Sequence, residues 1–248
     1  MPRGDEFLFG RSRQAKSARR TGARAAAFAA LLVAALFACG PAFAAAQKEL
    51  LYHVKHAIFG DIGTYSNTIE KSAGVTTVLT QAQFRVRILG IPLRSENGRH
   101  IEKWVKNRLV YFHGVTDKGG KPFEVTGKAK GNSFIIHSAL GKIVAPASVH
   151  PANPWSSNFL DSRTMMRVDT GKLETVRVTG SNPARVPIDG EAVPAREYKL
   201  VGKTKYWIWL DDAGVPVKFK VDDNTGMITF TLARCAGCAL DGRYAARR

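Results

Sequence analysis

The sequence predicts a mainly β protein in which a single antiparallel sheet curls into a partial (half) barrel, with a short capping helix near residues 155–167. Three observations lead to this fold class. Residues 78–88 alternate between apolar and polar side chains, about a dozen short strand-forming segments follow closely on one another, and turn residues separate them. Strands do not alternate with helices, which excludes a Rossmann or TIM-barrel architecture.

The first 44 residues have the features of a secretory signal peptide. A basic region precedes an uncharged apolar stretch at residues 25–38, which is shorter than the roughly 20 residues of a membrane span. The Ala-Phe-Ala sequence at 42–44 then supplies the small residues that signal peptidase recognises. We expect cleavage after Ala44, or after Ala46, and a mature protein in the periplasm.

Two other interpretations of this segment stay open. If the apolar stretch is not cleaved, it forms an N-terminal anchor helix. Alternatively, the Leu-Phe-Ala-Cys sequence at 36–39 resembles a lipobox, in which case the mature protein is a lipoprotein acylated at Cys39.

The segment from Val78 to Ile88 carries the clearest strand signal. Its even positions are mostly apolar, whereas glutamine and arginine occupy the odd positions from 81 to 87. Because successive side chains leave a strand on opposite faces, we expect one face on the core and the other in water. Further strands are expected at residues 50–59, 62–72, 99–106, 108–116, 122–130, 132–138, 173–179, 193–201, 205–210, 215–221 and 227–232.

Residues 145–169 interrupt this series of strands. Pro146, Pro151 and Pro154 disfavour a strand interior, and the residues from Trp155 onward suit a short helix. We therefore expect a loop followed by a helix that caps the sheet. Residues 45–234 as a whole are expected to form one domain.

Residues 235–248 are predicted to be a basic C-terminal tail beyond the last strand. Cys235 and Cys238 lie three apart at its start, and in an oxidising compartment we expect them to form a local disulfide. Unpaired thiols, a redox couple and half of a metal site are the alternatives, and a zinc site would need two further ligands.

Other motifs of catalysis, metal binding or cofactor binding are not found. A nucleophile elbow is absent, and the glycine-rich residues 114–121 mimic a phosphate loop but continue with Pro122 where a hydroxyl residue should be. The histidines have no chelating spacing: His53, His56, His100, His113, His137 and His150. We predict no catalytic residues, no metal and no cofactor.

The chain is strongly basic, with 37 Lys and Arg against 20 Asp and Glu and a formal net charge of +17. Removing residues 1–44, which hold seven bases and two acids, leaves a net charge of +12. An exported protein of this charge suits an anionic envelope surface, whereas nucleic acid is not expected as a partner outside the cytoplasm.

Several short motifs carry a family resemblance: Tyr52-His53-Val54, residues 59–63, Asn153-Pro154-Trp155, and residues 159–161, 169–173 and 206–217. On these motifs, residues 48–232 resemble exported bacterial proteins of the domain-of-unknown-function families numbered 6134 and 3108. The resemblance implies a partial barrel similar to that of the periplasmic lipoprotein carriers (LolA-like). It implies no catalytic residues, because these families have none established.

Two functional hypotheses follow. The first is a non-catalytic envelope protein that binds a lipid, an acylated partner or another apolar ligand in the concavity of its sheet. Its candidate ligand-binding residues are Phe84, Val86, Trp104, Phe112, Trp207 and Trp209. The second is an envelope enzyme or thiol-redox protein that acts through Cys235 and Cys238.

Overall fold

The computed structural model describes residues 46–88, 91–223 and 226–238. The chain separates into two units, Met1–Ala44 and Ala45–Arg248. The predicted signal peptide with Ala44 at its end, and Cys39, lie outside the described residues, whereas the alternative cleavage position, Ala46, is the first residue of the sheet. The second unit carries the whole sheet.

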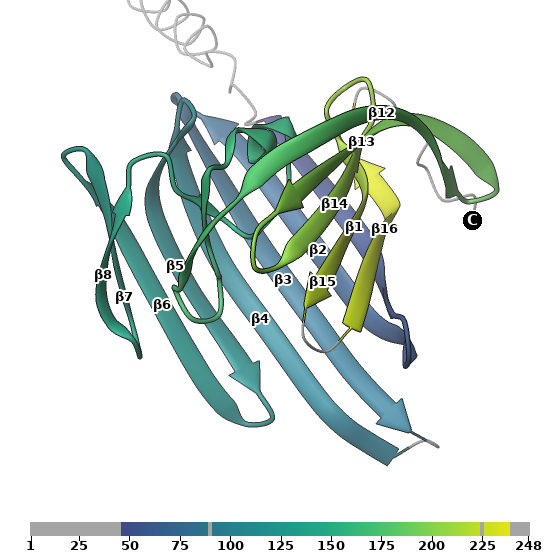
Figure 1. Ribbon diagram of the computed structural model, residues 1–248, viewed down its shortest axis with the longest axis horizontal. Helices are drawn as coiled ribbons and strands as arrows, with labels where there is room; N and C mark the ends of the chain where they lie inside the picture. The colour runs from purple at the N-terminus through teal and green to yellow at the C-terminus, as the bar shows by residue number, and fades with distance from the viewer. Residues whose placement is uncertain (1–45, 89–90, 224–225, 239–248) are drawn as a thin grey trace, which may run out of the picture. The chain divides into compact units, whose positions relative to one another are not determined.

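Thirteen strands form one antiparallel sheet (Figure 1). The sheet consists of two groups of strands, and within each group every strand pairs with the next one in the sequence. The first group is β1 (Ala46–His56), β2 (Gly60–Ser72), β3 (Val75–Ile88), β4 (Ile91–Val105), β5 (Arg108–Lys118), β6 (Lys121–Lys130), β7 (Ser133–Ser138) and β8 (Gly141–Pro146). The second group is β12 (Arg177–Ile188), β13 (Glu191–Val201), β14 (Lys205–Leu210), β15 (Pro216–Asp223) and β16 (Gly226–Ala236).

The first and last strands join the two groups, because β1 lies between β2 and β16. Val54 is opposite Phe230 in the β1–β16 pair and opposite Gly63 in the β1–β2 pair. The outermost strands of the sheet, β8 and β12, are not paired with each other, so the sheet is curled but not closed. The predicted fold class, a mainly β protein with one curled antiparallel sheet, is confirmed.

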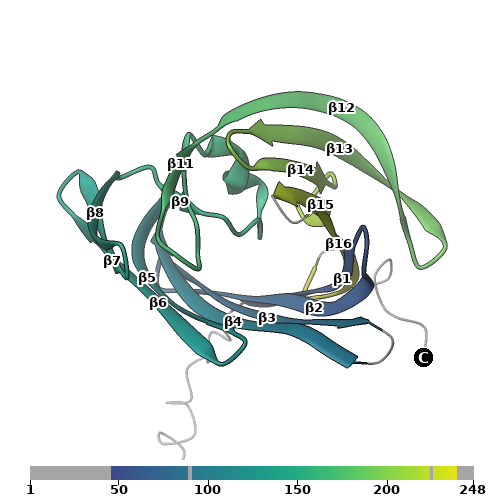
Figure 2. The same cartoon turned by 60° about the horizontal axis from the view of Figure 1, so that its bottom comes forward.

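The chain between β8 and β12 lies between the two edges of the sheet (Figure 2). It contains β9 (His150–Pro151), the 3-10 helix η1 (Ser157–Asp161), β10 (Thr164–Met166) and β11 (Leu173–Thr175). The three short strands form a separate sheet in the order β11-β10-β9. Phe159, Met165 and Met166 are buried, so this inner segment, residues 147–176, is part of the core.

The capping helix is shorter than predicted. The helix η1 spans five residues, and its N-cap Ser156 makes no side-chain capping bond. Serine and asparagine in this stretch favour turns over helix, and Thr164–Met166 instead pairs with β9 and β11.

Aromatic side chains fill the concave side of the sheet, which we call the inner face. The Phe219 and Phe230 rings stack with centroids 4.1 Å apart. Tyr52 and Tyr65 meet these rings edge-on at 5.2 and 5.3 Å. These four residues come from β1, β2, β15 and β16, so the ring cluster packs the junction between the two groups of strands.

Three segments of the sheet escaped sequence analysis. β4 begins at Ile91, eight residues before the predicted start, and β8 and most of β12 were assigned to no strand. Pro92 and Pro183 mask the pattern because proline is unfavourable inside a sheet. In β12 this proline is tolerated because the strand is an edge of the sheet.

The predicted tail boundary at residue 235 is too early. β16 continues to Ala236, and Cys235 lies opposite Leu50 of β1. The structure joins Cys235 to Cys238 by a disulfide, and these residues are 3% and 4% exposed. The motif therefore belongs to the packed end of the sheet, because β1 supplies it with a strand partner.

Candidate functional site

A cavity of about 1430 Å³ lies at the end of the sheet where β1, β3, β5 and β15 finish. Its lining combines an apolar wall, which comes mainly from β2, β3 and β16, with polar side chains from strand ends, the inner segment and the β13–β14 turn; we call the latter the polar wall. The apolar residues are Phe59, Ile62, Phe84, Val86, Leu140, Leu173 and Ile228. The polar and charged residues are His56, Glu96, Lys118, Arg167, Asp169, Thr170, Lys172, Glu174, Thr175, Lys203, Thr204, Lys205 and Asp222.

The apolar wall is built on neighbouring strands. Ile62 is in β2, Phe84 and Val86 are in β3, and Ile228 is in β16. Phe84 lies opposite Gly63, and its ring centroid is 6.1 Å from that of Phe230. The wall is therefore continuous with the ring cluster of the core, which fixes its position.

An ion cluster forms part of the polar wall. Asp169 of the inner segment accepts hydrogen bonds from Lys118 Nζ at 2.6 Å and from Arg167 Nη2 at 3.0 Å. Burial alone would raise the pKa of Asp169, but these hydrogen bonds and the two positive charges outweigh it and lower the pKa to about 2. Glu96 Oε1 lies 4.0 Å from Lys118 Nζ. The cluster thus fastens the inner segment to β4 and β5.

The structure brings together only two of the six predicted ligand-binding residues. Phe84 and Val86 line the cavity. Trp104 and Phe112 face the interior but are 3% and 0% exposed and do not line it.

Trp207 and Trp209, which were also predicted to bind the ligand, do not line the cavity either. Side chains alternate along β14, and Tyr206 faces inward, with its ring 6.3 Å from that of Phe159 in η1. Trp207 and Trp209 therefore lie on the outer face. There the ammonium groups of Lys218 and Lys220 lie 5.1 and 5.7 Å from the centre of the Trp209 ring. Both faces of β14 are apolar, as predicted, but Trp209 packs against lysines and neither tryptophan lines the cavity.

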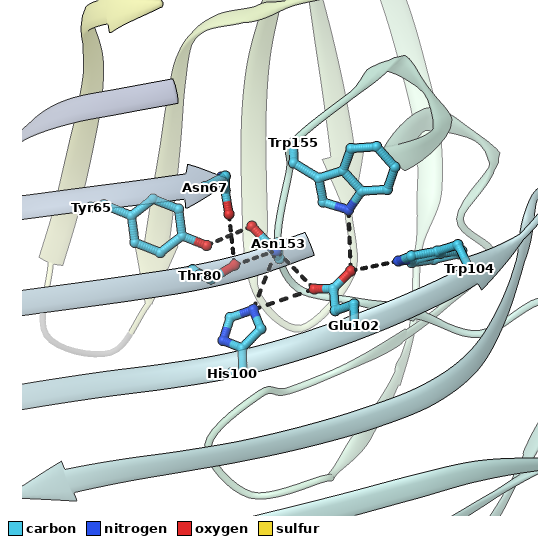
Figure 3. Close-up of polar contacts among 8 residues, drawn as sticks. All are labelled: Tyr65, Asn67, Thr80, His100, Glu102, Trp104, Asn153 and Trp155. Carbon is cyan, nitrogen blue, oxygen red and sulfur yellow. Dashed lines mark hydrogen bonds and ion pairs between the residues drawn. The ribbon is translucent and has the colours of Figure 1, made fainter. Parts of the chain in front are cut away.

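Sequence analysis missed a buried polar network on β2, β3 and β4 (Figure 3). Its centre is Glu102, which is 0% exposed. One carboxylate oxygen accepts hydrogen bonds from the indole nitrogens of Trp104 at 2.8 Å and Trp155 at 3.1 Å. The other accepts one from Asn153 at 2.8 Å and lies 3.3 Å from His100 Nε2. Trp155 and Asn153 belong to the inner segment, so Glu102 ties that segment to β4.

Asn153 extends the network to β2 and β3. Its amide nitrogen donates one hydrogen bond to Thr80 at 3.0 Å and one to Glu102, and these two bonds use both amide hydrogens. The same amide nitrogen lies 3.2 Å from His100 Nε2, so His100 contacts both Asn153 and Glu102. The Asn153 carbonyl oxygen accepts from the Tyr65 hydroxyl at 2.6 Å. Burial, followed by the nearby Glu102 charge, raises the pKa of Tyr65 well above its ordinary value, so this hydroxyl keeps its proton.

Three of the network residues occupy one row across the sheet. Asn67 is opposite Thr80, and Thr80 is opposite His100. Strand alternation could have revealed them, because His100, Glu102 and Trp104 share one face in the predicted strand at 99–106. What the sequence did not show was the partner, Asn153, which comes from the inner segment.

The described residues show neither a metal-binding cluster nor a membrane-spanning helix. No group of three or more His, Cys, Asp or Glu residues is placed to hold a metal ion in this part of the chain. Nor does it contain a helix with the length and apolar character needed to cross a membrane.

The comparisons with known proteins agree with this architecture. A crystal structure of a β-barrel-like protein of domain of unknown function DUF1849 from Brucella abortus is similar, with a TM-score of 0.57 and 10% sequence identity. The similarity covers 77% of this chain and 97% of that one. No curated protein matches the sequence. Residues 60–233 match the family described as Domain of unknown function (DUF6134), and the chain therefore belongs to that family.

Proposed function

We propose that the protein is an exported, non-catalytic envelope protein that binds a lipid or an acylated partner in the cavity. The observation that carries this proposal is the apolar wall of Ile62, Phe84, Val86 and Ile228 beside a large open volume. Small-molecule pockets typically measure about 300–1,000 Å³, so a cavity of about 1430 Å³ suits a long ligand. Each methylene that leaves water for such a wall contributes about 0.8 kcal/mol.

The proposal also includes export to the periplasm and a relationship to other periplasmic protein families. The signal-like residues 1–44 and the net charge of +12 on the remainder support a periplasmic protein near an anionic surface. The curled, open sheet with an inner segment supports a relationship to family 3108 and to the lipoprotein carriers of the periplasm. A lipoprotein form acylated at Cys39 remains the alternative anchoring mode.

Thiol-redox chemistry has less support as a function. Cys235 and Cys238 are almost fully buried, and Cys235 pairs with Leu50 of β1. Reactive cysteines typically sit in accessible, electropositive surroundings. The disulfide is more consistent with a structural clasp at the end of β16.

Native mass spectrometry of protein purified from periplasm tests the proposal directly. We expect a bound mass that is released by denaturation and extracted by organic solvent. In parallel, the delipidated protein should bind N-phenyl-1-naphthylamine, a neutral apolar fluorophore. Val86→Asp places a carboxylate on the apolar wall and should weaken this binding at least tenfold.

Val144→Asp is the matched control. Val144 is also a strand valine, but it is 59% exposed and does not line the cavity. It should bind the fluorophore as the wild type does. If folded Val86→Asp binds equally well, or if the wild type binds neither lipid nor fluorophore, the proposed function is wrong.

A further inference from the structure

The acidic groups of the cavity are mostly engaged by the protein itself. Asp169 binds Lys118 and Arg167, and Glu96 lies beside Lys118. Glu174 accepts a hydrogen bond from the backbone nitrogen of Thr204. The charges of Asp169 and Glu96 are therefore compensated by Lys118 and Arg167, whereas Glu174 keeps its charge and turns one oxygen toward a backbone donor.

The basic groups of the cavity are not balanced in the same way. Lys172, Lys203 and Lys205 line it, and all three are exposed. Among the described residues none of the three has a salt bridge or side-chain hydrogen bond. Asp222 lies opposite Lys205 in the β14–β15 pair, and Glu174 lies at Thr204, so these carboxylates offset at most two of the three charges. The polar wall thus presents an excess of positive charge at its rim.

The three lysines come from two separate segments that meet at this rim. Lys172 is in the turn between β10 and β11, and Lys203 and Lys205 lie at the turn between β13 and β14. Glu174 joins the two segments through its hydrogen bond to Thr204. The charges therefore converge on one edge of the cavity, beside a wall that is apolar.

We infer that the cavity takes a single-chain amphiphile with an anionic head group, whose chain lies on the wall of Phe84 and Val86 and whose head group meets Lys172, Lys203 and Lys205. This inference rests on the proposed function and adds the sign of the head-group charge. Three exposed ion-pair contacts should together give about a tenfold preference for an anionic over a neutral head group. Salt should reduce the preference, because exposed charges are screened.

Displacement of N-phenyl-1-naphthylamine by three probes with the same chain tests the inference. The probes are hexadecanoate, hexadecan-1-ol and hexadecylamine, each used below its micelle concentration at pH 8. The full mature protein should bind hexadecanoate about tenfold more tightly than the alcohol, and the amine most weakly. In Lys172→Gln/Lys203→Gln/Lys205→Gln, hexadecanoate and the alcohol should differ by less than about twofold, with affinity for the alcohol unchanged.

A second triple variant controls for net charge. Lys121, Lys128 and Lys142 are exposed and lie outside the cavity, so their replacement by glutamine should preserve the preference. Equal binding of the three probes by the wild type, or a preference that survives in the cavity variant, would overturn the inference and leave the proposed function standing. If no probe displaces the fluorophore and the fluorophore does not bind, the proposed function fails as well.

Discussion

Replacing Glu102 by glutamine perturbs the centre of the buried network with almost no change of shape. The carboxylate accepts hydrogen bonds from two indoles and one amide and faces His100 Nε2. In the Gln variant one of the two oxygens becomes an NH₂ group. If that group faces the indoles, two N–H donors lose their acceptor, and if it faces Asn153 and His100, the Asn153 amide loses its acceptor.

The cost follows from the number of bonds lost. A hydrogen bond to a charged acceptor contributes about 1.5–3 kcal/mol, and a buried donor without a partner costs about 1–3 kcal/mol. If the new amide group rotates so that its oxygen keeps both indole hydrogen bonds, only the contacts with Asn153 and His100 are lost. We expect Glu102→Gln to lower the free energy of unfolding by about 3 kcal/mol. Glu102→Leu removes the acceptor of both indoles and of the Asn153 amide and should cost more.

Urea denaturation followed by tryptophan fluorescence measures these differences, since Trp104 and Trp155 contact the substituted group. A loss of about 3 kcal/mol corresponds to a fall of roughly 6–12 °C in the thermal midpoint of a domain of this size. Glu70→Gln, at an exposed position of β2, is the control and should change stability by less than about 0.5 kcal/mol. A Glu102→Gln variant as stable as the wild type would refute the role of Glu102 as the acceptor that holds the inner segment.

Three further predictions concern other parts of the fold. Asp169→Asn should cost at most about 2 kcal/mol at pH 7. Because the folded pKa of about 2 lies below the ordinary 3.8, this stabilisation is present above pH 3.8 and lost as the pH falls toward 2, so acid titration of the variant should be flatter there. Gly127→Ala should destabilise by about 1–3 kcal/mol in thermal melts, because its Cβ would overlap the buried Phe134 ring, unless that ring can shift. Replacing Cys235 and Cys238 by serine should lower the free energy of unfolding in urea by about 2 kcal/mol, because the new hydroxyls are buried, while the short loop limits the entropic loss; an unchanged urea midpoint would show that the clasp is dispensable.

Strand alternation made most of the sheet predictable. Val78 and Thr80 are buried, and the odd-numbered Gln81, Gln83 and Arg85 are exposed, as the two-residue period required. The ends of strands were harder, because glycine and proline in β4 and β12 weaken the pattern where the strand lies at a bulge or an edge.

The site was predictable only in part. Phe84 and Val86 follow from the alternation of β3, which places them on the inner face near its end. The tryptophans of β14 could not be assigned in this way, because both of its faces are apolar and alternation alone does not say which face is inward. The contact of Tyr206 with Phe159, residues 47 positions apart in the chain, shows which face of β14 is inward.

The position of β1 in the middle of the sheet has a consequence for the order of folding. Each of the two strand groups grows by hairpins between neighbours in sequence, which close quickly. The β1–β16 pair instead joins distant residues, as in the contact of Arg234 with Glu49 across 185 positions. Contacts of such long separation are slow to form, because the closure entropy precedes any gain from pairing.

A chain that emerges from its N-terminus, during synthesis or translocation, therefore exposes one hydrogen-bonding edge of β1 until β16 arrives at the very end. The ring cluster cannot assemble before that moment, since Phe219 and Phe230 are on the last two strands. Late completion keeps the chain unfolded while it is still being threaded, but it also leaves an unpaired strand edge available to another copy. In this sheet, β1 is therefore the first strand to be synthesised, and one of its two edges is paired only when β16 follows.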